Sequence, residues 1–319
     1  MIGDRPLRIC ITGPTATGKT DAAVAVCRAI RGEVVSMDSM QIYQGLSIGT
    51  AKPTQAEMGG VPHHLLSFAP PQRAYTVAEY QRDARTSAAD IAYRGRIPVF
   101  CGGTGLYLQA VSRPLTFAAA HGAEGIREAL QREAAEPGGP ETLYARLLGA
   151  DPASAERLHP GNLRRVIRAL EVHALTGEPM SARRAEWDAE PEERWLIFAL
   201  TFLREALYAR IDARVDRMIA QGLEEEVRGL MDSVPLDAQA MQAIGYRDMV
   251  QVIRGESTLE DAIDRMKRNS RRYAKRQLTW LRRDPRVRWV DVSAFESADL
   301  VAAFLIDQIR QEMQDETMG

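Results

Sequence analysis

Residues 13–20 read GPTATGKT, which fits the pattern G-x-x-x-x-G-K-[ST] of loops that wrap around a chain of phosphates. An apolar run from Leu7 to Thr12 precedes this loop, and Thr20 to Arg31 follows it with the apolar spacing of a helix. In such a loop, successive backbone amides and the positive end of the helix face phosphate oxygens. The lysine reaches a terminal phosphate, and the hydroxyl after it binds Mg²⁺. The stretch therefore predicts a diphosphate-binding loop, with Mg²⁺ as cofactor on Thr20, formed by Gly13, Pro14, Thr15, Ala16, Thr17, Gly18, Lys19 and Thr20.

The segments around the loop predict a parallel sheet covered by helices. Further strand patterns cover residues 33–37, 97–101, 195–200 and 287–292. Helical patterns separate them, and this alternation is typical of a parallel sheet. We therefore expect an α/β fold, with a P-loop NTPase-like parallel sheet flanked by helices. Ligands of such sheets bind beyond the carboxyl ends of the strands, where we expect Asp38, the loop at 13–20 and the glycine turn at 102–105 to meet.

One long segment lacks strand patterns. From about residue 123 to 185 the sequence contains only helical patterns, and the strand pattern at 195–200 follows them. We therefore expect a catalytic core formed by residues 1–115 and 190–319, interrupted by an all-helical insertion domain formed by residues 116–189. Two long helical patterns, at 258–283 and 297–316, lie near the end of the chain.

Composition limits the class of protein. The chain has 319 residues, of which 45% are hydrophobic and 26% charged, as in ordinary soluble globular proteins. Its net charge of −2 means that any nucleic-acid surface must be a local patch. The sequence has no apolar run long enough for a membrane span and no signal-peptide pattern, so we expect a cytoplasmic protein without membrane contact. The three cysteines have no metal-ligand spacing and are expected to be buried thiols.

The residues at the sheet edge leave the reaction open. A motor or GTPase needs a second acid on Mg²⁺ after an apolar strand, but the strand at 97–101 ends in Gly-Gly-Thr. Asp38 is the acid that follows the strand at 33–37. A carboxylate there suits either a small-molecule kinase, where it touches the acceptor, or a transferase that activates its acceptor. The glycine loop recognises a diphosphate shape and does not by itself require a nucleotide.

Seven motifs occur in order along the chain. They are GPTATGKT at 13–20, MDSMQIYQGLSIGTAKPT at 37–54, VPHHLL at 61–66, GGTGLYLQA at 102–110, RRVIRALEVHALTG at 164–177, RIDARVDRMIAQGLEEEV at 210–227 and QAIGYRD at 242–248. This set closely resembles that of the bacterial tRNA dimethylallyltransferases, also called tRNA isopentenyltransferases, over about residues 9–283. The resemblance implies transfer of a dimethylallyl group from dimethylallyl diphosphate to N6 of adenine 37 in the anticodon loop of tRNA, giving N6-dimethylallyladenosine. The glycine loop would then hold the pyrophosphate of the donor.

The resemblance implies catalytic roles by position. Asp38 matches the general base of the family. The exocyclic amine of adenine is a poor nucleophile, and a carboxylate that accepts its N–H raises its electron density during attack on the allylic carbon. The pyrophosphate leaves with added negative charge, which Lys19, Thr20 with Mg²⁺ and Arg214 would stabilise, with Arg210 as a further diphosphate ligand. The alternative for both arginines is an ion pair on the helix face with a neighbouring aspartate of the RIDARVD stretch.

Family positions and local charge together imply a surface for tRNA. The residues assigned to it are Asp38, Ser39, Met40, Gln41, Thr104, Arg127, Arg164, Arg165, Arg168, Gln242, Gly245, Tyr246, Arg247, Arg271, Arg272 and Lys275. The last three belong to residues 265–283, which hold nine Lys and Arg, no acid, and the aromatic residues Tyr273 and Trp280. This composition favours binding to the phosphate backbone over a merely solvated face.

Some of these residues have simpler interpretations. Thr104 could cap the helix that follows it, and Arg127 could lie on a solvated helix face. Tyr246 could stack on a base or belong to the core. The adjacent His63 and His64 are interpreted as a loop scaffold rather than as metal ligands, because neighbouring side chains point differently and no third ligand is in view.

Four functions compete at this stage. The resemblance favours a tRNA dimethylallyltransferase, a monomer with tRNA and dimethylallyl diphosphate as partners. An adenylate isopentenyltransferase, which acts on free nucleotides, would have no use for the insertion or the basic stretch. A P-loop small-molecule kinase would use ATP and need an arginine-bearing lid, which residues 265–283 could imitate. Asp38 beside an intact glycine loop argues against a non-catalytic RNA-binding module.

Overall fold

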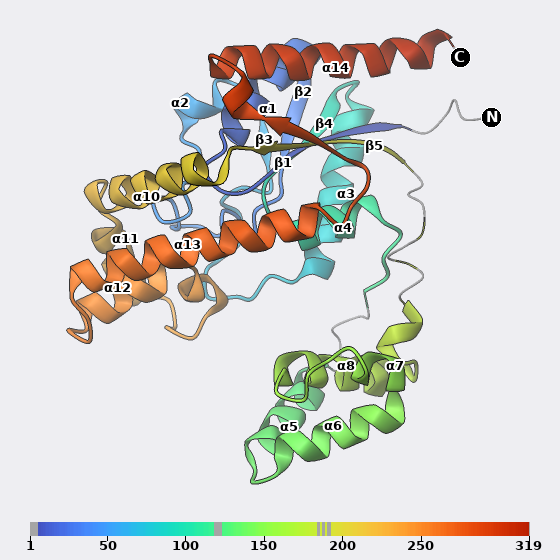
Figure 1. Ribbon diagram of the computed structural model, residues 1–319, viewed down its shortest axis with the longest axis vertical. Helices are drawn as coiled ribbons and strands as arrows, with labels where there is room; N and C mark the ends of the chain where they lie inside the picture. The colour runs from blue at the N-terminus through green and yellow to red at the C-terminus, as the bar shows by residue number, and fades with distance from the viewer. Residues whose placement is uncertain (1–5, 118–122, 184–185, 187–188, 190–192, 319) are drawn as a thin grey trace. The chain divides into compact units, whose positions relative to one another are not determined.

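The computed structural model describes residues 6–117, 123–183, 186, 189 and 193–318. The chain divides into two compact units, one formed by residues 1–112 and 192–319 and the other by residues 113–191 (Figure 1). These boundaries lie within a few residues of those expected for the core and the insertion. The last residues of the expected helical segment, 184–185, lie outside the described residues.

The larger unit contains a six-stranded parallel sheet with the order β3-β2-β4-β1-β5-β6. The strands are β1 (Leu7–Thr12), β2 (Gly32–Ser36), β3 (His63–His64), β4 (Ile97–Cys101), β5 (Arg194–Thr201) and β6 (Val287–Asp291). The predicted α/β fold with a parallel sheet is confirmed. One strand was missed, because residues 63–64 were expected as a loop and instead pair with Val34 and Val35. Two residues are too few to produce a strand pattern in the sequence.

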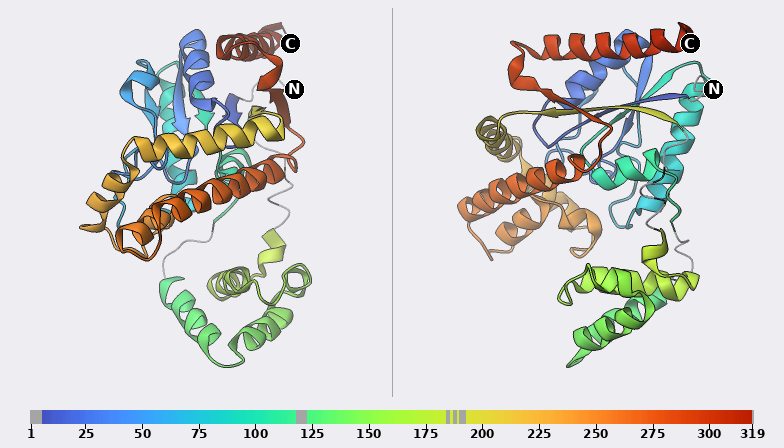
Figure 2. Two further views of the ribbon diagram at one scale, coloured as in Figure 1. Left: turned by 60° about the vertical axis from the view of Figure 1, so that its left-hand side comes forward. Right: turned by 45° about the vertical axis from the view of Figure 1, so that its right-hand side comes forward.

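Helices cover both faces of this sheet (Figures 1 and 2). In β1, Ile9 and Ile11 face one side and Cys10 faces the other. The first face packs against α1 (Lys19–Ile30) and α14 (Ala298–Met318). The second face packs in one core with α3 (Val77–Tyr93), α4 (Gly105–Ser112), α10 (Arg204–Ala220), α11 (Leu223–Met231), α12 (Tyr246–Ile253) and α13 (Leu259–Leu281). The short elements of this unit are α2 (Gln55–Met58) and the 3-10 helices η2 (Gln239–Gln242) and η3 (Val292–Ala294).

Backbone hydrogen bonds join the loops that follow β2 and β4, and the amide of Gly102 donates to the carbonyl of Ile11 in β1 at 3.3 Å. The amide of Met37 donates to the carbonyl of Cys101 at 2.7 Å, and the amide of Thr104 donates to the carbonyl of Met37 at 3.1 Å. Gly102 permits this approach, because a Cβ there would lie 2.4 Å from the carbonyl carbon of Met37. The three loops therefore meet at the carboxyl edge of the sheet, as the sequence predicts.

The smaller unit is built from helices. Its elements are α5 (Ala123–Ala135), α6 (Gly139–Ala150), α7 (Pro152–Ala155), α8 (Leu163–Thr176) and the 3-10 helix η1 (Met180–Arg183). The apolar stripe of α8, with Val166, Ile167 and Leu170, packs against α5 and α6 in a hydrophobic core of its own. In the described part of the whole chain, none of the helices is long and apolar enough to cross a membrane.

Candidate active site

A cavity of about 1090 Å³ lies in the larger unit, and four parts of the chain form most of its lining. These are residues 15–21 of the glycine loop and α1, residues 38–41 after β2, the face of α10 that carries Arg210 and Arg214, and one face of α13. The rest of the lining comes from residues 47–54, Glu57, residues 101–103 and residues 242–244. The cavity therefore brings the predicted diphosphate loop and the predicted base together.

The glycine loop has the backbone geometry that the motif predicts. A Cβ on Gly13 would lie 2.3 Å from the carbonyl oxygen of Leu200, so only glycine fits there. Gly18 adopts a left-handed conformation, with φ of 80°, directly before α1. Lys19 Nζ donates to the carbonyl of Pro14 at 2.7 Å. Burial, together with the nearby charge of Arg214, lowers the pKa of Lys19 to about 8.

Asp38 is held in a fixed orientation beside this loop. Its Oδ1 accepts hydrogen bonds from the amides of Met40 at 2.9 Å and Gln41 at 3.2 Å. The hydroxyl of Thr104 accepts a bond from the amide of Ser39 at 3.2 Å, while its carbonyl accepts bonds from the first amides of α4. Thr104 thus directly precedes α4, and its hydroxyl supports the turn that carries the carboxylate.

The two arginines of α10 face the cavity rather than the helix surface. The helix-face interpretation is wrong, because Asp212 pairs with Arg271 at 2.6 Å and Asp216 pairs with Lys267 at 2.6 Å. Arg210 Nε donates to the carbonyl of Ala16 at 2.9 Å.

Arg214, one turn further along α10, donates from Nη2 to the carbonyl of Thr50 at 3.3 Å. Burial lowers the pKa of this guanidinium, and the carboxylate of Asp38 acts in the opposite direction. Arg214 is therefore a half-buried cation beside the predicted base and the predicted diphosphate loop.

Glu226 on α11 was missed by the sequence analysis. Its carboxylate accepts bonds from the amides of Ser47 at 3.0 Å, Ile48 at 2.8 Å and Gly49 at 3.2 Å. These bonds hold the loop that presents the Thr50 carbonyl to Arg214. Glu226 ends a run of three glutamates, which in the sequence resembles a solvated helix face.

Two residues of α13 were also missed as parts of the site. Tyr273 lines the cavity and is hydrogen-bonded to the side chain of Thr104. Burial, and then the negative charge of Asp38, raise the pKa of Tyr273 to about 12. Gln277 lies one turn further along, with its side-chain amide between the glycine loop and the turn after β4. In the sequence, Gln277 is marked only by its position, because it is a polar residue that falls on the apolar face of α13.

The predicted tRNA contacts near α12 lie in different environments. Gln242 lines the cavity and Arg247 is exposed. Tyr246 is completely buried and donates from its hydroxyl to Glu226 at 2.5 Å. Gly245 is buried beside it. The prediction that Tyr246 stacks on a base does not fit this structure, and the core interpretation does.

The basic stretch of α13 is partly neutralised by neighbouring helices. Arg265 pairs with Asp248, and Lys267 and Arg271 pair with the two aspartates of α10. Arg271, predicted as a tRNA contact, is therefore engaged within the protein. The exposed cations of the stretch are Arg268, Arg272, Lys275, Arg276, Arg282 and Arg283.

In the smaller unit, the predicted contact residues divide into two kinds. Arg127 and Arg168 both donate to the buried carboxylate of Glu171, at 2.6 Å and 2.8 Å. Burial alone would raise the pKa of Glu171, but these two hydrogen bonds outweigh it and lower the pKa. Arg127 is thus part of an ion-pair cluster rather than a purely solvated face. Arg164 and Arg165 are exposed in the first turn of α8.

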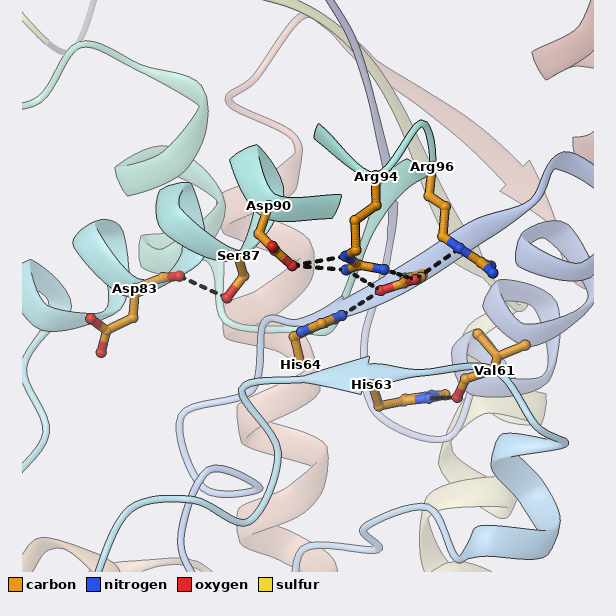
Figure 3. A network of polar contacts seen from close by, with 9 residues as sticks. Val61, His63, His64, Asp83, Ser87, Asp90, Arg94 and Arg96 are labelled. Carbon is orange, nitrogen blue, oxygen red and sulfur yellow. Dashed lines mark hydrogen bonds and ion pairs between the residues drawn. The ribbon is translucent and has the colours of Figure 1, made fainter. Parts of the chain in front are cut away.

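The adjacent histidines support the sheet (Figure 3). His64 Nε2 lies 2.7 Å from Glu33 in β2, while His63 Nδ1 lies 2.9 Å from the carbonyl of Val61. Arg94 and Arg96 approach the same buried carboxylate of Glu33. Among the described residues, no cluster of three His, Cys, Asp or Glu side chains could hold a metal ion.

The fold and the site define the class of protein: an α/β enzyme with a P-loop NTPase-like sheet, whose glycine loop and Asp38 carboxylate face one cavity. Comparisons with known proteins agree. A family model described as IPP transferase matches residues 41–284, and one described as isopentenyl transferase matches residues 8–68. The tRNA dimethylallyltransferase of Geobacillus kaustophilus is 50% identical over 287 residues, covering 89% of this chain and 90% of its own. That of Bacillus subtilis is 45% identical, with the same coverage.

Solved structures give the same result. The tRNA isopentenylpyrophosphate transferase of Bacillus halodurans is 40% identical, covers 99% of both chains and superimposes with a TM-score of 0.73. A eukaryotic dimethylallyltransferase acting on tRNA is 27% identical, with a TM-score of 0.83 over 96% of this chain and 80% of its own. The chain therefore belongs to the tRNA dimethylallyltransferase family, whose members are prenyltransferases that modify tRNA.

Proposed function

We propose that this chain transfers a dimethylallyl group from dimethylallyl diphosphate to N6 of adenine 37 in the anticodon loop of tRNA. The observation that carries the proposal is that Lys19, Arg214 and Asp38 line one cavity of about 1090 Å³. Pockets for one small ligand usually measure about 300–1,000 Å³, so this cavity has room for both a donor and an extruded base.

The donor end of the cavity suits a diphosphate. The amides of the 13–20 loop and the N-terminus of α1 supply partial positive charge, and Lys19 and Arg214 supply full charges. Both cations are half-buried, so their attraction for an anion is screened less than it would be in water. As the bond between the allylic carbon and the diphosphate oxygen breaks, these groups stabilise the charge that grows on the leaving group.

Mg²⁺ fits this end of the cavity. Thr20 lines the cavity in the first turn of α1, next to Lys19. Mg²⁺ is usually held by one or two protein ligands, with water and substrate phosphates completing its shell. A single hydroxyl beside the diphosphate loop matches that donor set. When bound, the ion would neutralise charge on the leaving diphosphate.

The acceptor end suits an amine. The oriented carboxylate of Asp38 accepts a proton from N6 while the new bond forms between N6 and the allylic carbon. An adenine in a single-stranded loop costs less to extrude than one in a duplex. The exposed cations of α13 and of the first turn of α8 provide charge for the RNA backbone. With tRNA as substrate, we expect the enzyme to act in the cytoplasm, as a monomer.

A transfer assay with alternative substrates tests this function. Purified enzyme is incubated with labelled dimethylallyl diphosphate, Mg²⁺ and tRNA that lacks the modification, with free AMP as a second acceptor. We expect label in tRNA, located on N6 of adenine 37 by mass spectrometry, and none in AMP. Label in AMP would instead indicate an adenylate isopentenyltransferase, and phosphate transfer from ATP without prenyl transfer would indicate a kinase.

A further inference from the structure

Gln277 joins two loops of the active site through one side chain. Its Oε1 accepts a hydrogen bond from the amide of Thr15 at 3.1 Å, and its Nε2 donates to the carbonyl of Gly103 at 2.9 Å. The residue is only 6% exposed. Thr15 belongs to the diphosphate loop, and Gly103 precedes Thr104, which supports the turn of Asp38. The side-chain oxygen of Gln277 therefore bonds the loop proposed to hold the dimethylallyl donor. Its side-chain nitrogen bonds the turn beside Asp38, which is proposed to activate the adenine.

The fit around Gln277 is specific for an amide. A Cβ on Gly103 would lie 2.2 Å from Nε2, so the side chain rests against bare backbone. The buried site offers one hydrogen-bond donor, the amide of Thr15, and one acceptor, the carbonyl of Gly103. A side chain that satisfies both needs one acceptor and one donor, as the amide of glutamine has. Glutamate would keep the bond from Thr15 but would place a carboxylate oxygen against the carbonyl of Gly103. Methionine has a similar size and would make neither bond.

The position of Gln277 on α13 links these loops to the basic surface. Tyr273, one turn earlier, is hydrogen-bonded to Thr104, and Trp280, one turn later, packs against Gly105. Residues at i, i+4 and i+7 share one face of a helix. On other faces of the same helix, Arg272 and Lys275 are exposed. Through Gln277, α13 therefore connects the surface that carries its exposed cations to both loops.

From this arrangement we propose that Gln277 is a positioning residue that couples tRNA binding on α13 to the conformation of the diphosphate loop. This inference rests on the proposed function. Bound tRNA, by fixing α13, fixes the Thr15 amide and the Gly103 carbonyl relative to each other and orders the loop for the diphosphate. Because coupling is reciprocal, the diphosphate favours tRNA binding by the same factor.

The test measures the affinity for inorganic pyrophosphate with Mg²⁺, in the absence and presence of an unmodified anticodon stem-loop. The variants are Gln277→Met, which loses both bonds, and Gln277→Glu, which keeps only the bond from Thr15. Gln308→Met on α14 is the matched control, because its side chain bonds Gln311 on the same helix. Thermal melting of each variant shows whether it is folded.

For the wild type we expect the stem-loop to tighten pyrophosphate binding by about 5-fold or more, a typical allosteric coupling. In Gln277→Met this ratio falls to near one, while the affinity for the stem-loop alone stays within about twofold, since the exposed cations are untouched. Gln277→Glu gives an intermediate ratio and decides the question if the methionine variant does not fold. The control keeps the wild-type ratio.

A wild-type ratio in both Gln277 variants would overturn the proposal, as would a ratio of one in the wild type. Loss of stem-loop affinity equal to the loss of pyrophosphate affinity would indicate a purely structural role and would also overturn it. A wild-type enzyme that transfers no dimethylallyl group to the stem-loop would overturn the proposed function instead. The transfer assay is run on the same protein preparations as the binding measurements, so the two failures are distinguished.

Discussion

At the scale of single residues, two half-buried cations line the cavity before any substrate is present. Lys19 and Arg214 both have lowered pKa values, caused chiefly by burial. In the absence of a ligand, Lys19 donates a hydrogen bond to the carbonyl of Pro14, and Arg214 donates one to the carbonyl of Thr50. A carbonyl compensates a buried cation only in part, so both side chains gain when an anion enters.

The lysine predicts a pH dependence. The ligand-free pKa of Lys19 is about 8, and diphosphate binds its charged form. Donor affinity should therefore be full below pH 8 and should fall as the pH rises through that value. The groups that face Lys19 are Cys101, whose pKa burial raises to about 12, Arg214 and Asp38. The measurement is kcat/KM for dimethylallyl diphosphate between about pH 7 and 9.5.

Lys52 supplies the control for this profile. It also lines the cavity, and burial lowers its pKa to about 8. Lys52→Arg removes that titration without removing the charge. An unchanged alkaline limb in this variant assigns the titration to Lys19. Loss of the limb in Lys52→Arg would show that the assignment to Lys19 is wrong.

Because Arg214 is a desolvated cation in the free enzyme, we expect it to raise activity but not to increase the stability of the fold. Replacing it with glutamine removes a half-buried cation whose neighbours in the free enzyme are the carbonyl of Thr50 at 3.3 Å and the carboxylate of Asp38. We expect kcat to fall about 100- to 1,000-fold, as when one group that stabilises the leaving charge is lost. The melting temperature should stay equal or rise, because the buried charge is a cost in the free enzyme. A lower melting temperature with nearly normal kcat would mean that Arg214 is structural.

At the scale of elements, β2, β3 and α3 are joined by one buried carboxylate (Figure 3). Hydrogen bonds from Arg94, followed by that from His64, lower the pKa of Glu33 to about 2 against the effect of burial. The stabilisation by this carboxylate is therefore present above its ordinary pKa of 4.5 and is lost as the pH falls toward 2.

Glu33→Gln should therefore be less stable than the wild type at pH 7 by about 1.5–3 kcal/mol, the range for hydrogen bonds to a charged group. The difference should shrink as the pH falls below 4.5, because the carboxylate is then protonated in the unfolded chain but stays charged in the folded protein until the pH nears 2. Urea unfolding at several pH values measures it. Glu256→Gln is the matched control, since Glu256 is exposed and pairs with Arg254 at 3.5 Å. An equal loss of stability at pH 7 and pH 3 would contradict this account.

Elements could be predicted where their signal is local. The glycine loop, the long strands and the helical insertion follow from patterns within a few residues, and the sheet edge then places Asp38 beside the loop. Gln277 could not be found this way, because its partner Thr15 is 262 positions away. Glu226 is 178 positions from the amide of Ile48. Only the fold shows that a polar side chain on an otherwise ordinary helix face is buried between two loops.

Tyr246 shows a second limit. Its motif allows either a stacking ring or a core ring, and both kinds of residue have the same chemistry in a sequence. Burial decides between them, and burial depends on how α11 and α12 pack together. The pairing of Arg271 with Asp212 is similar, because the charge run is visible in the sequence but its partner on α10 is not.

At the scale of the whole molecule, a net charge of −2 means that RNA binding depends on local patches. The exposed cations Arg272 and Lys275 belong to such a patch on α13. Replacing both with glutamine should weaken tRNA binding and lower the slope of log affinity against log salt by about one per lost phosphate contact. The measurement is a salt titration of stem-loop affinity.

Arg310 provides the control for the salt titration. It is exposed on α14, which covers the opposite face of the sheet from α13. Arg310→Gln removes one positive charge, as each single replacement on α13 does, and should leave the slope unchanged. If Arg310→Gln lowers the slope as much as a replacement on α13 does, the binding surface is not the one proposed.

The central claim is that one cavity holds the donor diphosphate beside a carboxylate that activates the adenine amine. The most direct test is single-turnover transfer of labelled dimethylallyl to an unmodified anticodon stem-loop by the wild type and by Asp38→Asn. We predict label on N6 of adenine 37 in the wild type, and a rate about 100- to 10,000-fold lower in the variant with both substrate affinities nearly unchanged. A wild-type rate in Asp38→Asn would contradict the role of the base, and an absence of label with the wild type would contradict the whole account.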